Sequence, residues 1–115
     1  MRTYIIYTDI ILNMNIDLPN GWSEKGGRIE QDYDVAINEN GVTVGYTYIN
    51  STSYSIWAGK DWDDNTTLDI SCKSEFKAKL KLLEFMSKYP KVRYESAERG
   101  IGTLYDENDS LVRGI

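Results

Sequence analysis

Hydrophobic and polar residues alternate along the opening run of the chain, from Tyr4 to Leu18. The positions on its apolar side are Tyr4, Ile6, Thr8, Ile10, Leu12, Met14, Ile16 and Leu18. Because successive side chains of a strand point to opposite faces, this alternation predicts an extended strand with one buried face. A straight strand of this length would be too long for a domain of this size. We therefore expect it to bend at Asp9 or over Asn13 to Asn15, or to break into two strands joined by a bulge.

A predicted turn follows at Pro19-Asn20-Gly21, and polar residues and a Gly-Gly pair extend it as a loop to Gly27. The next predicted element is a β-hairpin centred on Asn40-Gly41, a dipeptide that favours a two-residue turn. The expected pairing keeps all apolar residues on one face: Ile37 with Val44, Val35 with Tyr46, and Tyr33 with Tyr48.

A third strand is predicted from Ser53 to Ala58, which completes a three-stranded meander over residues 33–58. A short loop at residues 50–52 gives a register that keeps one face apolar, with Tyr48 opposite Tyr54, Tyr46 opposite Ile56, and Val44 opposite Ala58. The other face is expected to contact solvent or a partner; it holds Thr43, Thr47, Ser53, Ser55 and Trp57.

The hydrophobic period changes to that of an amphipathic helix over residues 72–89. The predicted apolar face consists of Cys72, Phe76, Leu80, Leu83 and Met86, with Ala78, Leu82, Phe85 and Tyr89 beside it. The opposite side gathers Lys73, Lys77, Lys81, Glu84 and Lys88. Ser71 or Ser74 is suited to cap the N-terminus, and Pro90 is expected to end the helix.

Shorter elements complete the chain. The polar stretch over residues 59–67 predicts a loop, and Val92 with Tyr94 predicts a short strand. Residues 103–105 and 110–113 predict a closing hairpin with Leu104 near Leu111. The fold class is therefore α+β: one domain over residues 1–115, in which one helix packs on an antiparallel sheet of about five or six strands.

Composition excludes several kinds of chemistry. The chain contains no histidine and only one cysteine, Cys72. Ser-His-Asp catalysis, histidine-ligated metals, multi-thiolate metal sites and an internal disulfide are therefore excluded. We expect no catalytic residues, no cofactor and no metal. We also expect a cytoplasmic protein, because the apolar opening run is interrupted by polar residues and resembles neither a signal peptide nor a membrane span.

Charge is unevenly distributed along the chain, whose net charge is −5. From Lys73 to Lys88 there are five lysines and two glutamates, so this segment is +3 and the remainder is −8. The net charge argues against direct binding of nucleic acid and favours a basic partner. The lysine-rich side of the helix is expected to be a solvated surface, because no aromatic residues interleave with the lysines.

Three candidate sites offer catalytic or metal-binding chemistry. Asp61, Asp63, Asn65 and Asp69 follow the ligand spacing of a calcium loop, but Thr66 replaces its glycine and Cys72 its bidentate glutamate. Trp57, Trp62 and Tyr54 near the aspartates resemble a sugar platform with a carboxylate pair, although adjacency in sequence does not fix the separation that glycoside hydrolysis needs. Cys72 has the position of a nucleophile at a helix N-terminus, but a place in the hydrophobic core suits it better.

An acidic surface with exposed aromatic residues is the feature of this sequence that best indicates a function, namely protein binding. Tyr and Trp are enriched in interfaces, and acidic patches accelerate association with basic proteins. We therefore predict a non-enzymatic, inhibitory binding protein that neutralises a basic, nucleic-acid-handling protein, as immunity proteins and phage anti-defence proteins do. The predicted partner-binding residues are Asp61, Trp62, Asp63, Asp64, Trp57 and Tyr54.

Two alternatives remain open at this point. One is a small carboxylate- or metal-dependent hydrolase that uses the same aspartates. The other is a structural module or homodimer that self-associates through a sheet edge, along the Tyr4 to Leu18 run.

Overall fold

The computed structural model describes residues 18–115. Only the last residue of the run predicted as a long strand, Leu18, belongs to the described part, so the prediction for Tyr4 to Asp17 lies outside it. Leu18 itself packs against the edge of the hydrophobic core.

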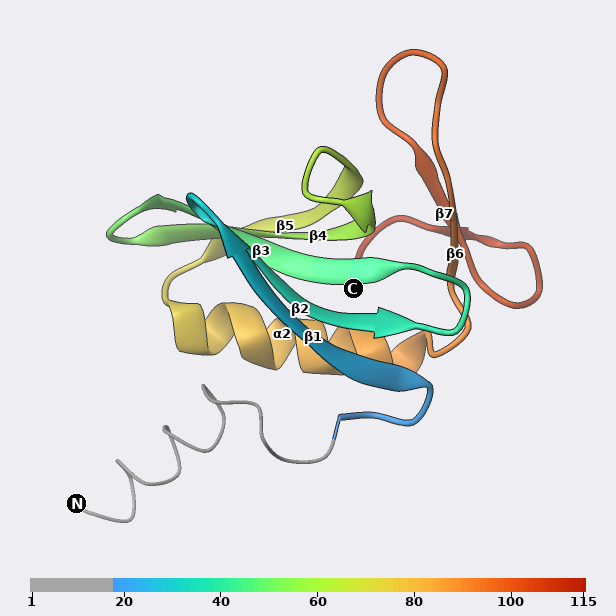
Figure 1. The fold of residues 1–115 in the computed structure, drawn as a ribbon, viewed down its shortest axis with the longest axis horizontal. Coiled ribbons are helices and arrows are strands. Elements are labelled where there is room, and N and C mark those ends of the chain that lie inside the picture. Colours follow the sequence, from blue (N-terminus) through green and yellow to red (C-terminus); the bar gives the residue numbers. More distant parts are fainter. Residues whose placement is uncertain (1–17) are drawn as a thin grey trace.

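Five antiparallel strands form the larger sheet, and they lie in the order in which they follow along the chain (Figure 1). They are β1 (Trp22–Ile29), β2 (Asp32–Asn38), β3 (Thr43–Asn50), β4 (Ser53–Asp61) and β5 (Asp64–Cys72). A second, three-stranded antiparallel sheet consists of β6 (Arg93–Glu95), β7 (Thr103–Tyr105) and β8 (Leu111–Val112). The helix α2 (Glu75–Lys88) joins the two sheets and lies across one face of the larger one. The predicted α+β class, with one helix on an antiparallel sheet, is confirmed.

The hydrophobic core lies between this sheet face and α2, and the second sheet closes one of its ends. Its largest fully buried side chains include Tyr46, Ile56, Leu82, Phe85 and Met86. Val92, Leu104 and Val112 join the same cluster from the segments around β6, β7 and β8. The indole N–H of Trp22 donates to the carbonyl of Met86 at 3.0 Å and so ties β1 to the helix.

The helix begins at Glu75 because Ser74 caps it. The Ser74 hydroxyl accepts a hydrogen bond from the backbone N–H of Lys77 at 3.1 Å, as an N-cap residue does. The prediction of Ser74 as a cap and of a helix end before Pro90 is confirmed. The predicted start at residue 72 is wrong, since Cys72 is the last residue of β5.

The helix packs on the sheet through Ala78, Leu82, Phe85 and Met86. The predicted apolar face is wrong at Leu80, which is 37% exposed. Leu80 is two residues from both Ala78 and Leu82, which turns it about 200° around the helix from the side that contacts the sheet. Lys79, next to Ala78 on the buried side of the helix, is only 3% exposed.

The β2–β3 hairpin is confirmed, but its register differs from the prediction. A three-residue loop, from Glu39 to Gly41, replaces the predicted two-residue turn: the N–H of Asn38 bonds the carbonyl of Val42, and Gly41 has φ +77°. Such a loop needs a left-handed residue, which glycine provides. The pairs are Tyr33 with Tyr46 and Ala36 with Val44, and Val35 is an extra, bulged residue between them.

The side chain of Asn38 holds this turn and attaches it to the segment after the helix. Its Oδ1 accepts the N–H groups of Asn40 at 3.0 Å and Val42 at 2.9 Å. Its Nδ2 donates to the carbonyls of Pro90 at 3.3 Å and Val92 at 2.9 Å. With 7% exposure, Asn38 is a buried polar residue whose side-chain groups are hydrogen-bonded.

The β7–β8 hairpin repeats the same turn. Asp106 takes the place of Asn38: its N–H bonds the carbonyl of Ser110, and its Oδ1 accepts the N–H groups of Asn108 and Ser110, both at 2.9 Å. Asp109 has φ +64° and takes the place of Gly41. The hairpin itself is confirmed, although Leu104 pairs with Val112 and not with the predicted Leu111.

The predicted register of β3 with β4 is confirmed in all three pairs: Tyr48 with Tyr54, Tyr46 with Ile56, and Val44 with Ala58. The turn is shorter than predicted, because a shift at Ile49 lets Asn50 pair with Ser53 and leaves residues 51–52 as the turn. The short strand predicted around Val92 and Tyr94 is also present, as β6.

The turn predicted at Pro19-Asn20-Gly21 is confirmed, with the N–H of Trp22 bonded to the carbonyl of Pro19 at 3.2 Å. Its predicted continuation as a loop to Gly27 is wrong, because the chain from Trp22 onward is β1. Its pairing with β2 shifts between Glu24 and Gly27, where Gly26 has φ +60°. The bulge hides the strand from a pattern-based analysis. In the described part of the chain, no helix combines the length and hydrophobicity needed to cross a bilayer.

Candidate functional site

The predicted acidic loop forms the tip of the β4–β5 hairpin. Asp61 ends β4, Asp64 begins β5, and Trp62 and Asp63 form the turn between them. The prediction of a loop over residues 59–67 is therefore wrong for most of its length. The pairing of β4 with β5 shifts register at three points, which breaks the alternation that would have revealed the strand.

Internal hydrogen bonds fix the backbone of this tip. The Oδ1 of Asp61 accepts the N–H of Asp63 at 2.9 Å. The side-chain amide of Asn65 donates to the carbonyls of Asp61 at 3.0 Å and Trp62 at 2.8 Å. The side chain of Asn65, which falls on the calcium-loop spacing, thus shapes the turn.

Asp64 attaches the tip to the second sheet. Its Oδ1 accepts the hydroxyl of Tyr94 at 2.7 Å, and its Oδ2 accepts the hydroxyl of Ser96. Both hydrogen bonds lower the pKa of the Asp64 carboxyl, and the bond from Ser96 has the larger effect. Burial and the bond to Asp64 raise the pKa of Tyr94 to about 12. Sequence reasoning missed Tyr94 and Ser96 because only the tertiary fold brings them to the hairpin, from about thirty residues away.

Two side chains of the tip remain available to a partner. Trp62 is 42% exposed, and Asp63 is exposed too. The carboxylate of Asp63 forms neither a hydrogen bond nor an ion pair with any residue between 18 and 115. An indole ring therefore stands beside an unpaired carboxylate on a backbone whose shape depends on neither side chain.

Trp57 and Tyr54 do not join this tip, which corrects the predicted six-residue site. Trp57 is 2% exposed, on the sheet face opposite to the helix, and its ring covers Gly45: a Cβ there would lie 2.4 Å from the ring. Tyr54 is half-buried on the helix face, where its ring meets Tyr46 and Tyr48 edge-on at 6.0 and 5.5 Å between ring centroids.

The exposed face predicted for the meander also needs correction. Trp57 and Thr43 are buried, whereas Thr47, Ser53 and Ser55 are intermediate in exposure. The hydroxyl of Thr43 accepts a hydrogen bond from Lys25 at 3.1 Å, and Lys25 also lies 3.5 Å from a carboxylate oxygen of Asp34. The indole N–H of Trp57 has no hydrogen-bond partner among the described residues.

The strand geometry separates the residues of the calcium-loop pattern. Asp61 and Asp63 lie at the tip, whereas Asp69 lies near the other end of β5 and bonds Lys81 of the helix at 2.6 Å. The hydrogen bond from Lys81 is the main reason that the pKa of Asp69 falls to about 2. Within residues 18–115, no group of three or more aspartate, glutamate or cysteine side chains converges as metal ligands would. The calcium-loop interpretation of this pattern is wrong.

A polar cluster that sequence reasoning missed lies where the start of α2 meets β1 to β3. The hydroxyl of Tyr46 donates to Glu75, whose carboxylate lies 3.6 Å from Arg28. The Nζ of Lys79 lies 5.0 Å from the centroid of the Tyr33 ring. Burial raises the pKa of Tyr46 and lowers that of Lys79. Since Glu75 already binds both a phenol and a guanidinium, we assign this cluster to packing of the helix on the sheet.

Cys72 and the helix lysines behave mostly as predicted. Cys72 is 3% exposed, and burial raises the pKa of its thiol, so its predicted place in the core is confirmed. Lys73, Lys77 and Lys88 are exposed.

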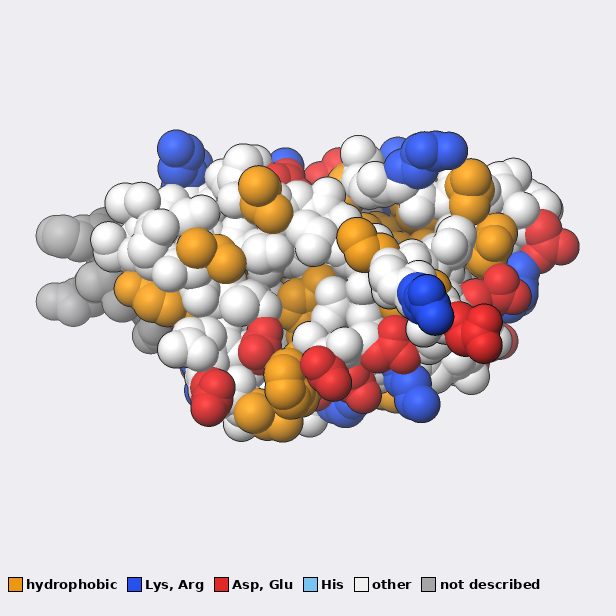
Figure 2. Space-filling view, turned by 90° about the horizontal axis from the view of Figure 1, so that it is seen from above, with side chains coloured by type: hydrophobic (Ala, Val, Ile, Leu, Met, Phe, Trp, Pro, Cys, Tyr) orange, Lys and Arg blue, Asp and Glu red, His pale blue; other side chains and the backbone are white. Residues whose placement is uncertain are grey.

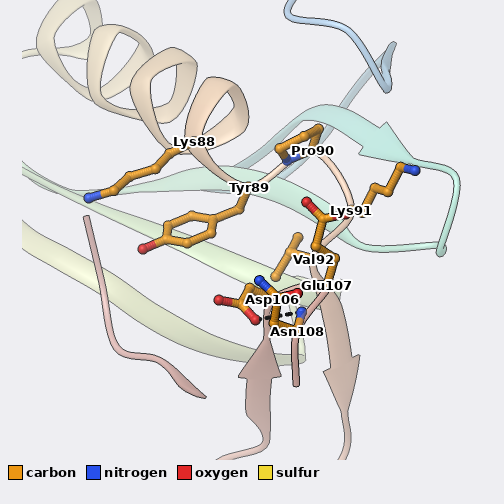
Figure 3. A pocket seen from close by; sticks show the side chains of 8 residues that line it. All are labelled: Lys88, Tyr89, Pro90, Lys91, Val92, Asp106, Glu107 and Asn108. Atoms are coloured by element: carbon orange, nitrogen blue, oxygen red, sulfur yellow. Dashed lines mark hydrogen bonds between the residues drawn. The ribbon is translucent and has the colours of Figure 1, made fainter. Parts of the chain in front are cut away.

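A cavity of about 170 Å³ lies between the end of α2 and the β7–β8 turn (Figure 3). Lys88 and Lys91 line it together with Asp106 and Glu107, so its rim carries both signs of charge. The Oδ1 of Asp106 is engaged in its own turn. A second, more open cavity of about 350 Å³ lies between Thr66 of β5 and the second sheet. None of the six predicted binding residues lines either cavity.

Comparison with known proteins gave no match to a family model, to a curated protein or to a solved structure.

Proposed function

We propose that the chain is a non-enzymatic acidic binding protein that inhibits a basic, nucleic-acid-handling protein through the tip of the β4–β5 hairpin. The observation that carries the proposal is Trp62, 42% exposed and flanked by Asp61 and Asp63 on a hydrogen-bonded turn. Tryptophan is among the residues most enriched at the energetic centre of interfaces. In this proposal Trp62 fills a pocket of the partner, and the carboxylates meet cations that would otherwise bind phosphates.

The rigidity of the tip supports this role. Binding costs conformational entropy when a loop must be ordered, and a pre-organised loop avoids that cost. Asp64 fixes the turn to Tyr94 of β6 and to Ser96 just after it, and Asn65 fixes the carbonyls of the turn. The backbone that carries Trp62 and Asp63 is therefore held in one conformation before a partner arrives.

Charge supports the same class of partner. The net charge of −5 makes encounters with basic proteins faster and encounters with nucleic acid slower. The absence of histidine removes the commonest general base and metal ligand. Immunity proteins and phage anti-defence proteins work in this way, and the likeness to them rests on size, charge and missing catalytic equipment.

The test is affinity capture from a native lysate with matched charge variants. Asp63→Lys and Trp62→Ala change the tip, and Glu30→Lys makes the same charge change on an exposed residue of the β1–β2 turn, at the opposite end of the sheet. We expect the wild-type chain and Glu30→Lys to retain one stoichiometric basic protein, and the two tip variants to lose it while their melting temperatures stay unchanged. The captured protein should lose its activity on nucleic acid when the wild-type chain is added.

Two outcomes would contradict the proposal. One is capture of the same partner by all variants, which would place the contact elsewhere. The other is a captured protein whose activity on nucleic acid is unaffected by a saturating amount of the chain.

A further inference from the structure

Two asparagines of the chain are followed directly by glycine, in Asn20-Gly21 and in Asn40-Gly41. The backbone nitrogen after an asparagine can attack the side-chain amide carbon Cγ. A glycine makes this attack easiest, because it has no side chain in the way and its backbone is free to turn. Both asparagines are exposed, so accessibility does not distinguish them. Their hydrogen bonds do.

Hydrogen bonds hold both reacting groups of the Asn40-Gly41 pair. The side-chain Nδ2 of Asn40, the atom that would leave, donates to the carbonyls of Lys91 at 3.0 Å and Val92 at 3.4 Å. The backbone nitrogen of Gly41, the atom that would attack, donates to the carbonyl of Asn38 at 3.1 Å. The attack has to break bonds at both atoms, and the loss of two typical hydrogen bonds slows a reaction about tenfold or more.

The Asn20-Gly21 pair lies in the turn that precedes β1, beside the end of α2 (Figure 1). One hydrogen bond, from the N–H of Trp22 to the carbonyl of Pro19, closes the turn, and Gly21 has φ +94°, as in a type II turn. The nitrogen of Gly21 belongs to the central peptide of the turn, which this bond does not use. Within residues 18–115, neither the side chain of Asn20 nor the N–H of Gly21 forms a hydrogen bond.

We propose that Asn20 is a site of spontaneous deamidation in the folded protein and that Asn40 is protected. The nitrogen of Gly21 forms a bond to Cγ of Asn20, the bond from Cγ to Nδ2 breaks, and Nδ2 leaves as ammonia with the proton of the attacking nitrogen. Water then opens the cyclic imide. Attack of water at the side-chain carbonyl gives aspartate, and attack at the main-chain carbonyl gives isoaspartate. The reaction needs only water and the chain itself.

Isoaspartate at this position would disturb the attachment of β1. It adds one carbon to the main chain directly before Gly21, which packs closely on Pro90: a Cβ on Gly21 would lie 3.3 Å from the Cβ of Pro90. The next residue, Trp22, is 7% exposed and ties β1 to α2 through its bond to Met86. We therefore expect the isoaspartate form to melt at a lower temperature than Asn20→Asp, which has the same charge and an unaltered main chain.

The test is incubation of the wild-type chain in mildly alkaline buffer, once folded and once in concentrated urea, followed by peptide mapping with mass spectrometry. Deamidation raises the mass of a peptide by one unit, and trypsin places Asn20 and Asn40 in different peptides. We expect Asn20 to convert at least about tenfold faster than Asn40 in the folded chain. In urea the two rates should be similar, because both asparagines precede a glycine and the hydrogen bonds are gone.

Charge provides a second measurement. The wild-type chain has a net charge of −5, with acidic and basic side chains interspersed over the side of the molecule in Figure 2. One additional negative charge should make the product bind an anion exchanger more tightly, and Asn20→Asp marks where the aspartate form elutes. Asn20→Gln is the matched control, because its longer side chain closes a cyclic imide much more slowly. We expect this variant to form no such product in the same time.

Conversion of Asn40 as fast as Asn20 in the folded chain overturns the proposal. So does a folded chain in which Asn20 stays intact while both asparagines convert in urea. An isoaspartate form that melts together with Asn20→Asp refutes the effect on β1. None of these outcomes depends on the partner proposed above.

Discussion

Asn38→Asp is the most informative single change to the fold, because it replaces one NH₂ group by an oxygen at a buried position. Asn38 is 7% exposed, and its Nδ2 donates to the carbonyls of Pro90 and Val92. The variant keeps the Oδ1 that accepts the N–H groups of Asn40 and Val42. Only the contact between the β2–β3 turn and the segment after the helix changes.

The expected cost follows from these two bonds. Each is worth about 0.5–1.5 kcal/mol, and a buried carbonyl left without a donor costs about 1–3 kcal/mol more. Val92 keeps a longer bond from Asn40 at 3.4 Å, so the loss falls mainly on Pro90. We expect the free energy of unfolding to fall by about 2–4 kcal/mol at neutral pH, which shifts the urea midpoint by about 1–2 M.

The loss should depend on pH. The carbonyls of Pro90 and Val92 disfavour a charged carboxylate, so the pKa of the new aspartate is raised above its unfolded value of about 3.9. A raised pKa destabilises the folded state above that pKa, and the effect disappears below the unfolded pKa. The difference between wild type and Asn38→Asp should therefore shrink when urea unfolding is measured at about pH 4 and lower.

The β7–β8 turn provides the control. Asp106 has the place of Asn38 there, and Asp106→Asn keeps the Oδ1 that accepts two N–H groups. We expect Asp106→Asn to change stability by less than about 0.5 kcal/mol. Equal losses from Asn38→Asp and Asp106→Asn would refute the role assigned to the Asn38 amide.

Two further predictions test the helix and the β5 strand. Leu82→Ala should lower the free energy of unfolding by about 2–5 kcal/mol, because Leu82 is fully buried in the core. Leu80→Ala should lower it by only about 1 kcal/mol, because Leu80 is 37% exposed. If urea unfolding ranks the two variants in the reverse order, the helix is rotated relative to the sheet. Asp69→Asn should lower the urea midpoint slightly at neutral pH but leave it unchanged below about pH 2. The lowered pKa of Asp69 stabilises the folded state above the unfolded pKa of this carboxyl, and this contribution is lost as the pH falls through about 2. A midpoint difference that persists in strong acid would mean that the bond to Lys81 is not its cause.

The sequence pattern was informative where local signals and tertiary packing agree. The register of β3 with β4 could be predicted because every pair put apolar residues on one face. The helix end at Pro90 and the cap at Ser74 follow from side chains that act on their own backbone. The three-residue loop after Asn38 was less accessible, because the Asn38 side chain that holds it also donates to the backbone carbonyls of Pro90 and Val92, which only the tertiary fold brings close.

Strands with bulges could not be recognised from alternation. β1 contains Gly26 and Gly27 and has little intrinsic preference for a strand, and it forms because β2 offers a pairing edge and Trp22 reaches the helix. In β5 the register shifts disrupt the period of two. In both cases tertiary pairing overrides local preference.

For the candidate site, the sequence identified the acidic tip but not which aromatic residues accompany it. Trp57 appeared exposed because it alternates with residues of the apolar face. Its burial depends on Gly45, directly across the β3–β4 pair, which leaves room for the ring to lie on the sheet. A glycine opposite a tryptophan was the available signal, and it requires the correct register to be noticed.

In the β4–β5 tip, the side chains that fix the backbone are different from those that are exposed, so the exposed ones can be replaced without a change in the fold. Asp61, Asp64 and Asn65 determine the conformation, whereas Trp62 and Asp63 take part only through their backbone. Under the proposed function, exchange of these two side chains would alter what the tip binds without rebuilding the scaffold. The same two positions could be randomised as a minimal library for selecting new binding partners.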